Sequence, residues 1–239
     1  MIPWYLISVA FLGAMVQAVT GFGAPILMMA FFPHWMPYSE SIALVHAIAM
    51  AGVVTLVVRY HASINWKVLW PLAIPSLLIG AIATLLSISL KSALMTRLLG
   101  MFLILTSLFF LFLQGRMTIQ AKARNGVLAG LASGICNGFF GISAPPAALY
   151  LMNGLGQKEA YLATLQTFFL LSNVESMAMR SAYGAYQNLS WGLLLLGWAA
   201  ILLGTLCGNL LFRHLSFSLL RPLVYIFVAI AGLWSVIAG

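Results

Sequence analysis

The sequence predicts an all-α polytopic membrane protein made of two repeats, each of about four apolar segments. Of the 239 residues, 63% are hydrophobic and 6% are charged, so polar side chains are too few to cover a soluble globule. Apolar stretches of roughly 18 to 25 residues, the length that crosses a bilayer as a helix, recur along the chain. A segment broken by glycine and proline opens each half.

The two broken segments cover residues 3–32 and 126–153. The first contains Gly13, Gln17 and the run Gly21-Phe22-Gly23-Ala24-Pro25, and the second contains Gly130, Gly134 and the run Asn137-Gly138-Phe139-Phe140-Gly141-Ile142-Ser143-Ala144-Pro145-Pro146. Irregular backbone in a bilayer survives only where protein or a water-filled cavity covers it. A matched pair of such breaks therefore predicts a substrate site. Each segment is either a long bent helix or a re-entrant hairpin.

Six ordinary spans are expected near residues 40–58, 68–88, 95–114, 160–179, 191–211 and 219–238. Polar positions correspond between the halves at offsets of 119 to 125 residues: Glu40 with Glu159, Ile64-Asn65-Trp66 with Leu189-Ser190-Trp191, Gly80 with Gly204, and Arg97 with Arg221. A duplication explains this correspondence, whereas chance hydrophobic similarity would not preserve polar positions. We predict repeats over 1–114 and 126–239, joined by a basic cytoplasmic linker over 115–125.

The basic residues favour one topology. If all eight apolar regions cross the bilayer, the Lys and Arg residues divide six against five, without bias. If both broken regions enter and leave on the same face, the division is eight against three, with Lys91, Arg97 and Arg180 in the minority. The second division fits the excess of Lys and Arg in cytoplasmic loops. It leaves three crossings per half, so the repeats would be inverted, with both termini outside.

The breaks are the predicted substrate site. Glycine lets the backbone approach a ligand, and proline interrupts the helical ladder. Helix ends exposed at a break offer N–H groups and a positive dipole end to an anion. The predicted substrate-binding residues are Gln17, Thr20, Gly21, Phe22, Gly23, Asn137, Gly138, Phe139, Gly141 and Ser143. The alternative is that the glycines only allow close helix packing.

Glu175 and His46 are the candidates for proton coupling. Glu175 lies inside a predicted span, where an ionisable group is costly and faces a cavity or a partner. Its alternative role is a structural pair with Arg180 or Arg59. His46 lies in the corresponding span of the first half, and histidine titrates near neutral pH. The alternative for His46 is a hydrogen bond to a neighbouring helix.

Other functions have little support in the sequence. It contains no nucleotide-binding loop, metal-ligand cluster or Ser/His/Asp set, so we predict no cofactor, no metal and no enzymatic activity. Three acids in the whole chain disfavour a site for divalent cations. Two of them, Glu40 and Glu159, are expected at helix starts, where a carboxylate complements the helix dipole. The basic residues stand singly, so they form no nucleic-acid patch.

The paired openings, the Asn65-Trp66 and Ser190-Trp191 span starts, and the Gly80 and Gly204 positions together resemble the sulfite exporter TauE/SafE family of bacterial and archaeal membrane permeases. The resemblance covers nearly the whole chain. Ala24 and Asn65 depart from the fuller glycine run and the Asp-Trp pair of many members. The resemblance implies movement of sulfite, organosulfonates or related small organic anions, commonly outward, across the cell membrane.

The predicted function is thus a secondary transporter that carries a small anion by alternating access, in the inner membrane of a bacterial or archaeal cell. The two breaks are expected to meet near the bilayer midplane. The expected partners are the lipid bilayer, the anion and protons, and a homo-oligomer is left open. Two alternatives are a passive anion channel, which would use the same residues without alternation, and a non-transporting scaffold subunit, which would have no cavity at the breaks.

Overall fold

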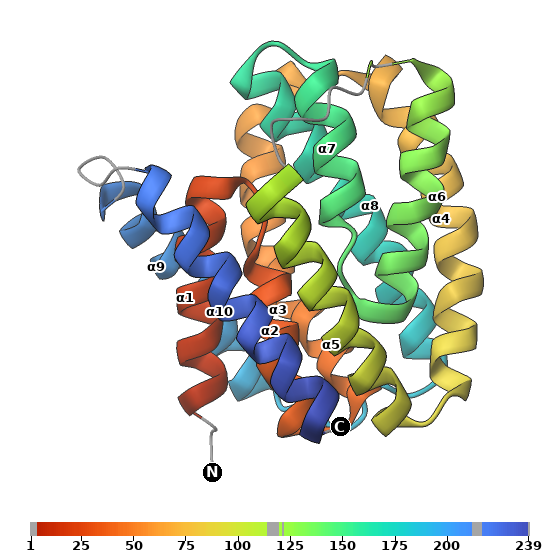
Figure 1. Ribbon diagram of the computed structural model, residues 1–239, viewed down its shortest axis with the longest axis vertical. Coiled ribbons are helices and arrows are strands. Elements are labelled where there is room, and N and C mark those ends of the chain that lie inside the picture. Colours follow the sequence, from red (N-terminus) through yellow and green to blue (C-terminus); the bar gives the residue numbers. More distant parts are fainter. Residues whose placement is uncertain (1–3, 114–119, 121, 212–216, 239) are drawn as a thin grey trace. The chain divides into compact units, whose positions relative to one another are not determined.

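The computed structural model describes residues 4–113, 120, 122–211 and 217–238, and all regular structure among them is helical (Figure 1). The helices are α1 (Trp4–Thr20), α2 (Ala24–Phe31), α3 (Tyr38–Tyr60), α4 (Trp66–Ser89), α5 (Ser92–Leu108), α6 (Ala123–Phe140), α7 (Ala144–Gly154), α8 (Lys158–Ala182), α9 (Trp191–Leu211) and α10 (Phe217–Ala238). Two 3₁₀ turns, η1 (Phe32–His34) and η2 (His61–Ser63), and one π-helical turn, η3 (Phe109–Leu113), accompany them. Most of the predicted linker lies outside the described residues.

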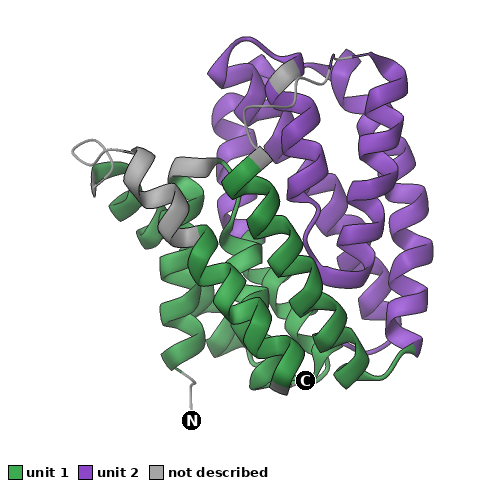
Figure 2. Cartoon of the chain, in the orientation of Figure 1, with its two compact units in different colours: residues 1–49, 90–117, 186–239 green, residues 50–89, 118–185 purple. Residues whose placement is uncertain are grey.

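The chain forms two compact units that are interleaved along the sequence (Figure 2). Unit 1 contains residues 1–49, 90–117 and 186–239, and unit 2 contains residues 50–89 and 118–185. Helix α3 begins in unit 1 and ends in unit 2. Each unit therefore takes helices from both halves of the sequence: unit 1 holds α1, α2, α5, α9 and α10, and unit 2 holds α4, α6, α7 and α8.

Helices α3, α4, α8, α9 and α10 cover five of the six predicted ordinary spans, and α5 with the π-helical turn η3 covers the sixth as far as residue 113. Among the described residues, four helical stretches are long and apolar enough to cross a membrane: Tyr38–Ser63, Trp66–Ser89, Ser92–Phe112 and Trp191–Leu210. Helix α8 is long enough, with 25 residues, but polar side chains such as Gln166 and Glu175 make it less apolar. The apolar part of α10 whose side chains are described, Tyr225–Ile237, is shorter.

The first broken segment is a helical hairpin in unit 1. Ala24 begins α2 and lies beside Gly13 of α1, so close that a Cβ on Gly13 would be 3.1 Å from the Ala24 Cα. At the open end of the hairpin, the rings of Tyr5 and Trp35 lie 4.4 Å apart. The chain thus turns back at residues 21–23 and leaves at the end where it entered (Figure 1).

The second broken segment is a helical hairpin in unit 2. The chain turns at residues 141–143, and α7 runs back along α6. Tyr150 of α7 therefore lies against Gly126 in the first turn of α6, where a Cβ would meet the Tyr150 hydroxyl at 2.8 Å. Both broken segments are hairpins, and the alternative of one long bent helix is wrong.

Glycines allow α6 to lie directly on α4 in unit 2. A Cβ on Gly130 would overlap the carbonyl oxygen of Leu72, and a Cβ on Gly134 would overlap that of Ser76. Such backbone-to-backbone contact is typical of small residues between membrane helices. The alternative proposed for these glycines, close helix packing, is confirmed for Gly130 and Gly134.

Glycines bring helix backbones into the same kind of contact in unit 1, where Gly208 lies on Met15 of α1 and Gly100 lies on Gly232 of α10. A Cβ on Gly204 of α9 would overlap the carbonyl oxygen of Phe11 in α1. In the predicted repeat, α9 corresponds to α4 and α1 corresponds to α6. The α1–α9 pair and the α4–α6 pair are therefore matching pairs, each made of one helix from either half of the sequence.

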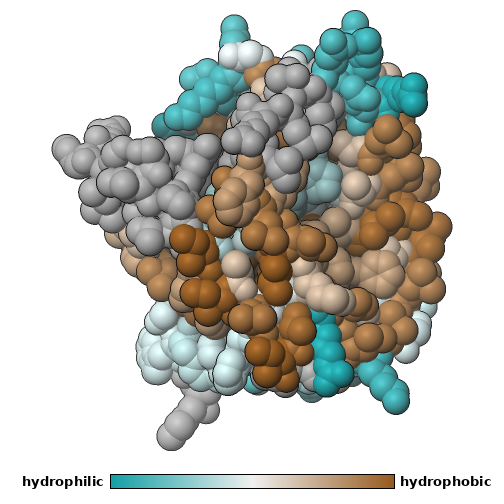
Figure 3. Space-filling model, in the orientation of Figure 1, coloured by the Kyte–Doolittle hydropathy of each residue, from teal (hydrophilic) through white to brown (hydrophobic). Residues whose placement is uncertain are grey.

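Helix α4 carries its large apolar side chains on the outside of unit 2. Ile74, Leu78, Ile82 and Leu86 recur at every fourth residue and are each more than half exposed. The opposite face is buried and consists largely of small residues: Ala73, Ser76, Gly80, Ala83, Thr84 and Ser87. Figure 3 shows hydrophobic side chains along α4 and α6 and hydrophilic ones toward the helix ends. A helix that faces lipid and packs through small residues has this distribution.

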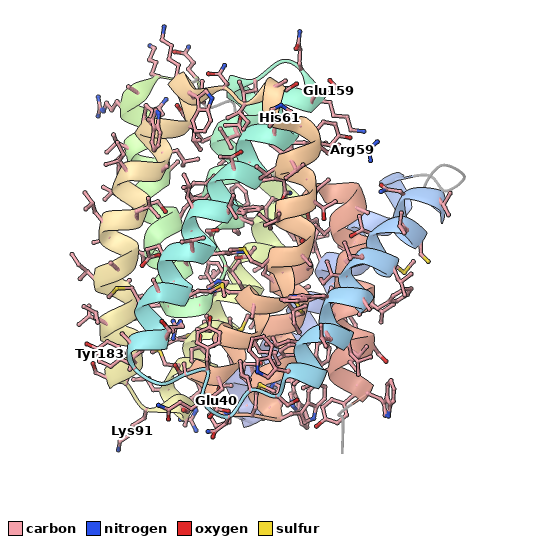
Figure 4. The ribbon with its side chains drawn as sticks, turned by 180° about the vertical axis from the view of Figure 1, so that it is seen from behind. Glu40, Arg59, His61, Lys91, Glu159 and Tyr183 are labelled. Atoms are coloured by element: carbon pink, nitrogen blue, oxygen red, sulfur yellow. The ribbon has the colours of Figure 1, made fainter. Side chains whose placement is uncertain are left out.

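Basic residues gather at one end of unit 2. Helices α4, α6 and α8 begin at the same end and carry Lys67, Arg124 and Lys158 in their first turns. Figure 4 shows Arg59 at this end and Tyr183 at the opposite end. Basic residues therefore lie at the same end of unit 2 both at the start of the second hairpin (Arg124) and just after it (Lys158). The topology in which the second broken segment enters and leaves on one face predicts this arrangement.

Corresponding positions of the predicted repeat begin corresponding helices. Before α4, the Asn65 side-chain oxygen accepts a hydrogen bond of 3.2 Å from the Val68 N–H. Before α9, the Ser190 hydroxyl oxygen accepts one of 3.2 Å from the Leu193 N–H. Both residues are favoured helix caps. The predicted placement of Glu40 and Glu159 in the first turns of α3 and α8 is also confirmed.

Candidate functional site

The first break is a glycine turn held by Gln17. Gly21 and Gly23 have φ of 79° and 132°, values that residues with a Cβ rarely adopt. The Gln17 side-chain oxygen accepts a hydrogen bond of 3.2 Å from the N–H of Ala24, the first residue of α2. One of the N–H groups expected to be open to an anion is therefore already bound. The side chain of Thr20, which ends α1, lies outside the described part.

Phe22 closes the first break with two aromatic neighbours. Its ring centroid lies 5.2 Å from that of Phe110 in the π-helical turn, and Phe110 stacks on Tyr225 at 5.0 Å. Phe22, Gly23 and Tyr225 line a cavity of about 10 Å³. That volume holds about one water molecule, so an anion can enter here only if these side chains move.

The second break also ends on a left-handed glycine. Gly141 has φ 67° and ψ 20°, and its N–H donates to the Asn137 carbonyl at 2.8 Å. Ser143 precedes α7 and is buried, but its side chain makes no capping hydrogen bond to α7. Pro145 and Pro146 lack N–H groups, so they remove two donors from the first turn of α7. Main-chain donors are thus few at this break, as the two prolines in the sequence imply.

Side chains, more than main-chain groups, make the contacts that hold the second break. Asn137 is 1% exposed, and its Nδ2 donates to the Ser172 carbonyl of α8 at 3.2 Å. Gly138 packs on α4, where a Cβ would come within 2.5 Å of the Ala83 Cβ. Phe139 is half-buried at the last turn of α6. The break therefore joins α6 to α4 through a glycine and to α8 through an amide.

A buried arginine holds the end of α6. Arg180 of α8 is fully buried, and its Nη2 donates to the Gly138 carbonyl at 2.8 Å and to the Ser87 hydroxyl at 3.2 Å. The last carbonyls of a helix lack partners within it and carry the negative end of its dipole. Arg180 therefore both caps α6 and places a positive charge at the break.

Glu175 lies next to this arginine. Its carboxylate hydrogen-bonds the Asn137 side chain and is close enough to Arg180 for an electrostatic interaction. One carboxylate oxygen faces Gly80, where a Cβ would come within 3.2 Å of it. The pairing of Glu175 with Arg180, one of the alternatives, is supported. His46 is buried in the part of α3 that belongs to unit 1.

Several buried oxygens around the Glu175–Arg180 pair have no hydrogen-bond partner among the described residues. They are Asn137 Oδ1, Glu175 Oε1, and the hydroxyls of Thr84, Ser133, Ser172 and Ser176. Most buried polar atoms in proteins are satisfied by protein or by water, so each exception needs an explanation. A group of such atoms on α4, α6 and α8 indicates a place for water or for a ligand.

The sequence analysis named Arg180 as a possible partner of Glu175 and used it for topology, but did not include it among the substrate-binding residues. A signal was present, because Arg180 follows Glu175 by five residues in the same predicted helix. Its partners at residues 87 and 138 are distant in sequence, and only the fold brings them together.

Long apolar helices, lipid-facing side chains and paired helical hairpins with irregular turns define a multi-pass membrane protein of the transporter class. The chain belongs to the sulfite exporter TauE/SafE family, whose model matches residues 6–235. It is therefore a membrane transporter of the sulfite or anion type, which fits the prediction that it is not an enzyme. No curated protein and no solved structure matches the chain.

Proposed function

We propose that the protein is a secondary transporter that moves sulfite, an organosulfonate or a related organic acid across a bacterial or archaeal inner membrane by alternating access. The observation that carries this proposal is the pair of helical hairpins. Each hairpin turns at a glycine of positive φ, and the second helix of each has proline in its first turn. Hairpins of this kind expose helix ends inside the membrane, and such ends bind substrates in many transporters.

The anion is bound by the residues of both breaks: Gln17, Thr20, Gly21, Phe22, Gly23, Asn137, Gly138, Phe139, Gly141 and Ser143. Different parts of this set have different roles. The glycines set the turns, Phe22 opens and closes the first break, and the Asn137 amide fixes the second break to α8 through its hydrogen bonds to Ser172 and Glu175. Protons are carried by Glu175, with His46 as a second candidate.

The repeats are inverted in the membrane, with both termini outside. Two facts support this topology. The first fact is that the chain leaves each hairpin at the end where it entered. The second is that the basic residues of unit 2 gather at the end of that unit where the α6–α7 hairpin opens. Three crossings then separate the two hairpins of the chain, so they enter the bilayer from opposite faces.

A carrier is favoured over the passive channel by the closed first break. The cavity that Phe22 lines has a volume of about 10 Å³, which is too small for an anion until those side chains move. An aromatic closure that must move before an anion can bind fits a protein that alternates between states. The scaffold alternative leaves the buried, unpartnered oxygens around Glu175 unexplained.

Binding is tested first by thermal unfolding of the detergent-purified protein with a panel of sulfite, methanesulfonate, acetate and chloride at equal ionic strength. A ligand bound by the folded state at 100 times its Kd stabilises that state by about 2.7 kcal/mol. We expect sulfite or methanesulfonate to raise the unfolding temperature by several degrees above chloride. Equal unfolding temperatures with all four anions would contradict the proposal.

A further inference from the structure

The basic residues of unit 2 divide into two groups by position. Lys67, Arg124 and Lys158 belong to the first turns of their helices at one end of the unit. Arg180 belongs to the other end of α8, where it is fully buried against Gly138. Arg180 is thus the cation that the fold brings to the second break.

We propose that Arg180 provides the positive charge that binds the transported anion, and that Glu175 cancels this charge whenever its carboxylate is ionised. This inference rests on the proposed function and names the coupling device of that same site. With Glu175 ionised, the pair is neutral and the anion binds weakly. With Glu175 protonated, the charge of Arg180 is left for the anion, so one proton travels with each monovalent anion.

The surroundings offer the donors that an oxyanion requires. The hydroxyls of Ser172 and Ser176 lie next to Glu175 on α8, are at most 1% exposed, and have no partner among the described residues. A hydroxyl can rotate to donate its hydrogen. Sulfonate and carboxylate oxygens accept such bonds, and charge-assisted ones are the stronger kind.

The charge balance depends on few groups. On α8 the charged neighbour of Glu175 is Arg180. Two other helices contact the Glu175 carboxylate. Helix α6 contacts it with the side chain of Asn137, which follows Cys136 in the sequence, and α4 contacts it with Gly80. Helix α7 contains no charged residue, and its titratable Tyr150 lies against Gly126, at the far end of α6. Protonation of Glu175 therefore changes the local net charge from zero to plus one.

The first test measures methanesulfonate binding and uptake between pH 5 and 9, with Glu175→Gln against wild type. Methanesulfonate stays ionised throughout this range, so any proton that moves with it is carried by the protein.

In wild type we expect uptake to carry protons inward. We also expect the affinity for methanesulfonate to rise by up to about tenfold per pH unit of acidification, the limit for one linked proton. Glu175→Gln should bind with an affinity independent of pH and should carry net negative charge. Glu159→Gln, an exposed glutamate on the same helix, is the control and should behave as wild type.

The second test separates the charge of Arg180 from its role in holding α6. Both variants contain Glu175→Gln, so the half-buried carboxylate of Glu175 is not left without its cation. Adding Arg180→Lys keeps the charge and should keep methanesulfonate affinity within about tenfold of Glu175→Gln, whereas adding Arg180→Gln should weaken it by more than tenfold. Equal affinities in these two variants would overturn the assignment of Arg180.

The outcomes distinguish this inference from the proposed function. Methanesulfonate uptake by wild type without proton movement, or an equal pH dependence in Glu175→Gln, would overturn the coupling and leave a transporter. Absence of both binding and uptake for the whole anion panel in wild type would overturn the proposed function, and the coupling with it.

Discussion

Replacing Arg180 alone with Gln is expected to lower the free energy of unfolding by about 3 kcal/mol, the lower end of the range for breaking a buried charge pair, because Glu175 is only half-buried. The side chain is fully buried, and its loss leaves the Gly138 carbonyl and the Ser87 hydroxyl without this donor. It also leaves the carboxylate of Glu175 without its cation.

Denaturant unfolding in detergent measures this effect. The matched control is Arg124→Gln, because Arg124 is an exposed arginine at the start of α6 and surface changes of this kind cost within about 0.5 kcal/mol. Adding Glu175→Gln to Arg180→Gln removes the stranded charge and should recover part of the stability. A single Arg180→Gln variant as stable as the control would show that Arg180 does not hold the second break.

Replacing Gly130 with Leu is expected to cost about 3 kcal/mol, the upper part of the usual range for overpacking. The substituted Cβ would overlap the main-chain oxygen of Leu72, and a backbone atom cannot rotate away as a side chain can. Helices α4 and α6 would have to separate, which would disturb the contacts of the α6 end with Arg180 as well.

The control for this substitution is Gly192→Leu, in the first turn of α9, where a Cβ meets no atom within 4 Å. Unfolding by denaturant, read by helical circular dichroism, compares the two. If both variants are equally stable, α6 does not lie on α4 as described, and the account of the second hairpin fails with it.

The sequence was informative where local chemistry decides the structure. Asn65 and Ser190 could be placed at helix starts because each is a good cap followed by an apolar run. The breaks at Gly21 and Gly141 could be located because only glycine adopts their positive φ readily. Choosing hairpins over bent helices required more, since only the distribution of basic residues favoured them.

The sequence was less informative where distant segments meet. It gave no sign that Arg180 is buried, because an arginine near the end of an apolar span is normally placed at the interface. It also led to a site built largely from main-chain N–H groups, whereas the Gln17 side chain already binds one such group at the first break. The pairing of α4 with α6 depends on glycine contacts that hydropathy cannot reveal. The prediction that the two breaks meet stays a prediction.

The central claim, carriage of an anion by alternating access, is tested most directly by counterflow in proteoliposomes. Vesicles loaded with a high concentration of unlabelled methanesulfonate are diluted into trace labelled methanesulfonate, with the membrane potential clamped at zero. A carrier predicts transient accumulation of label above its outside concentration, abolished in empty vesicles and in vesicles without protein. Label that only equilibrates, at a rate that does not saturate with concentration, would identify a channel and contradict the account.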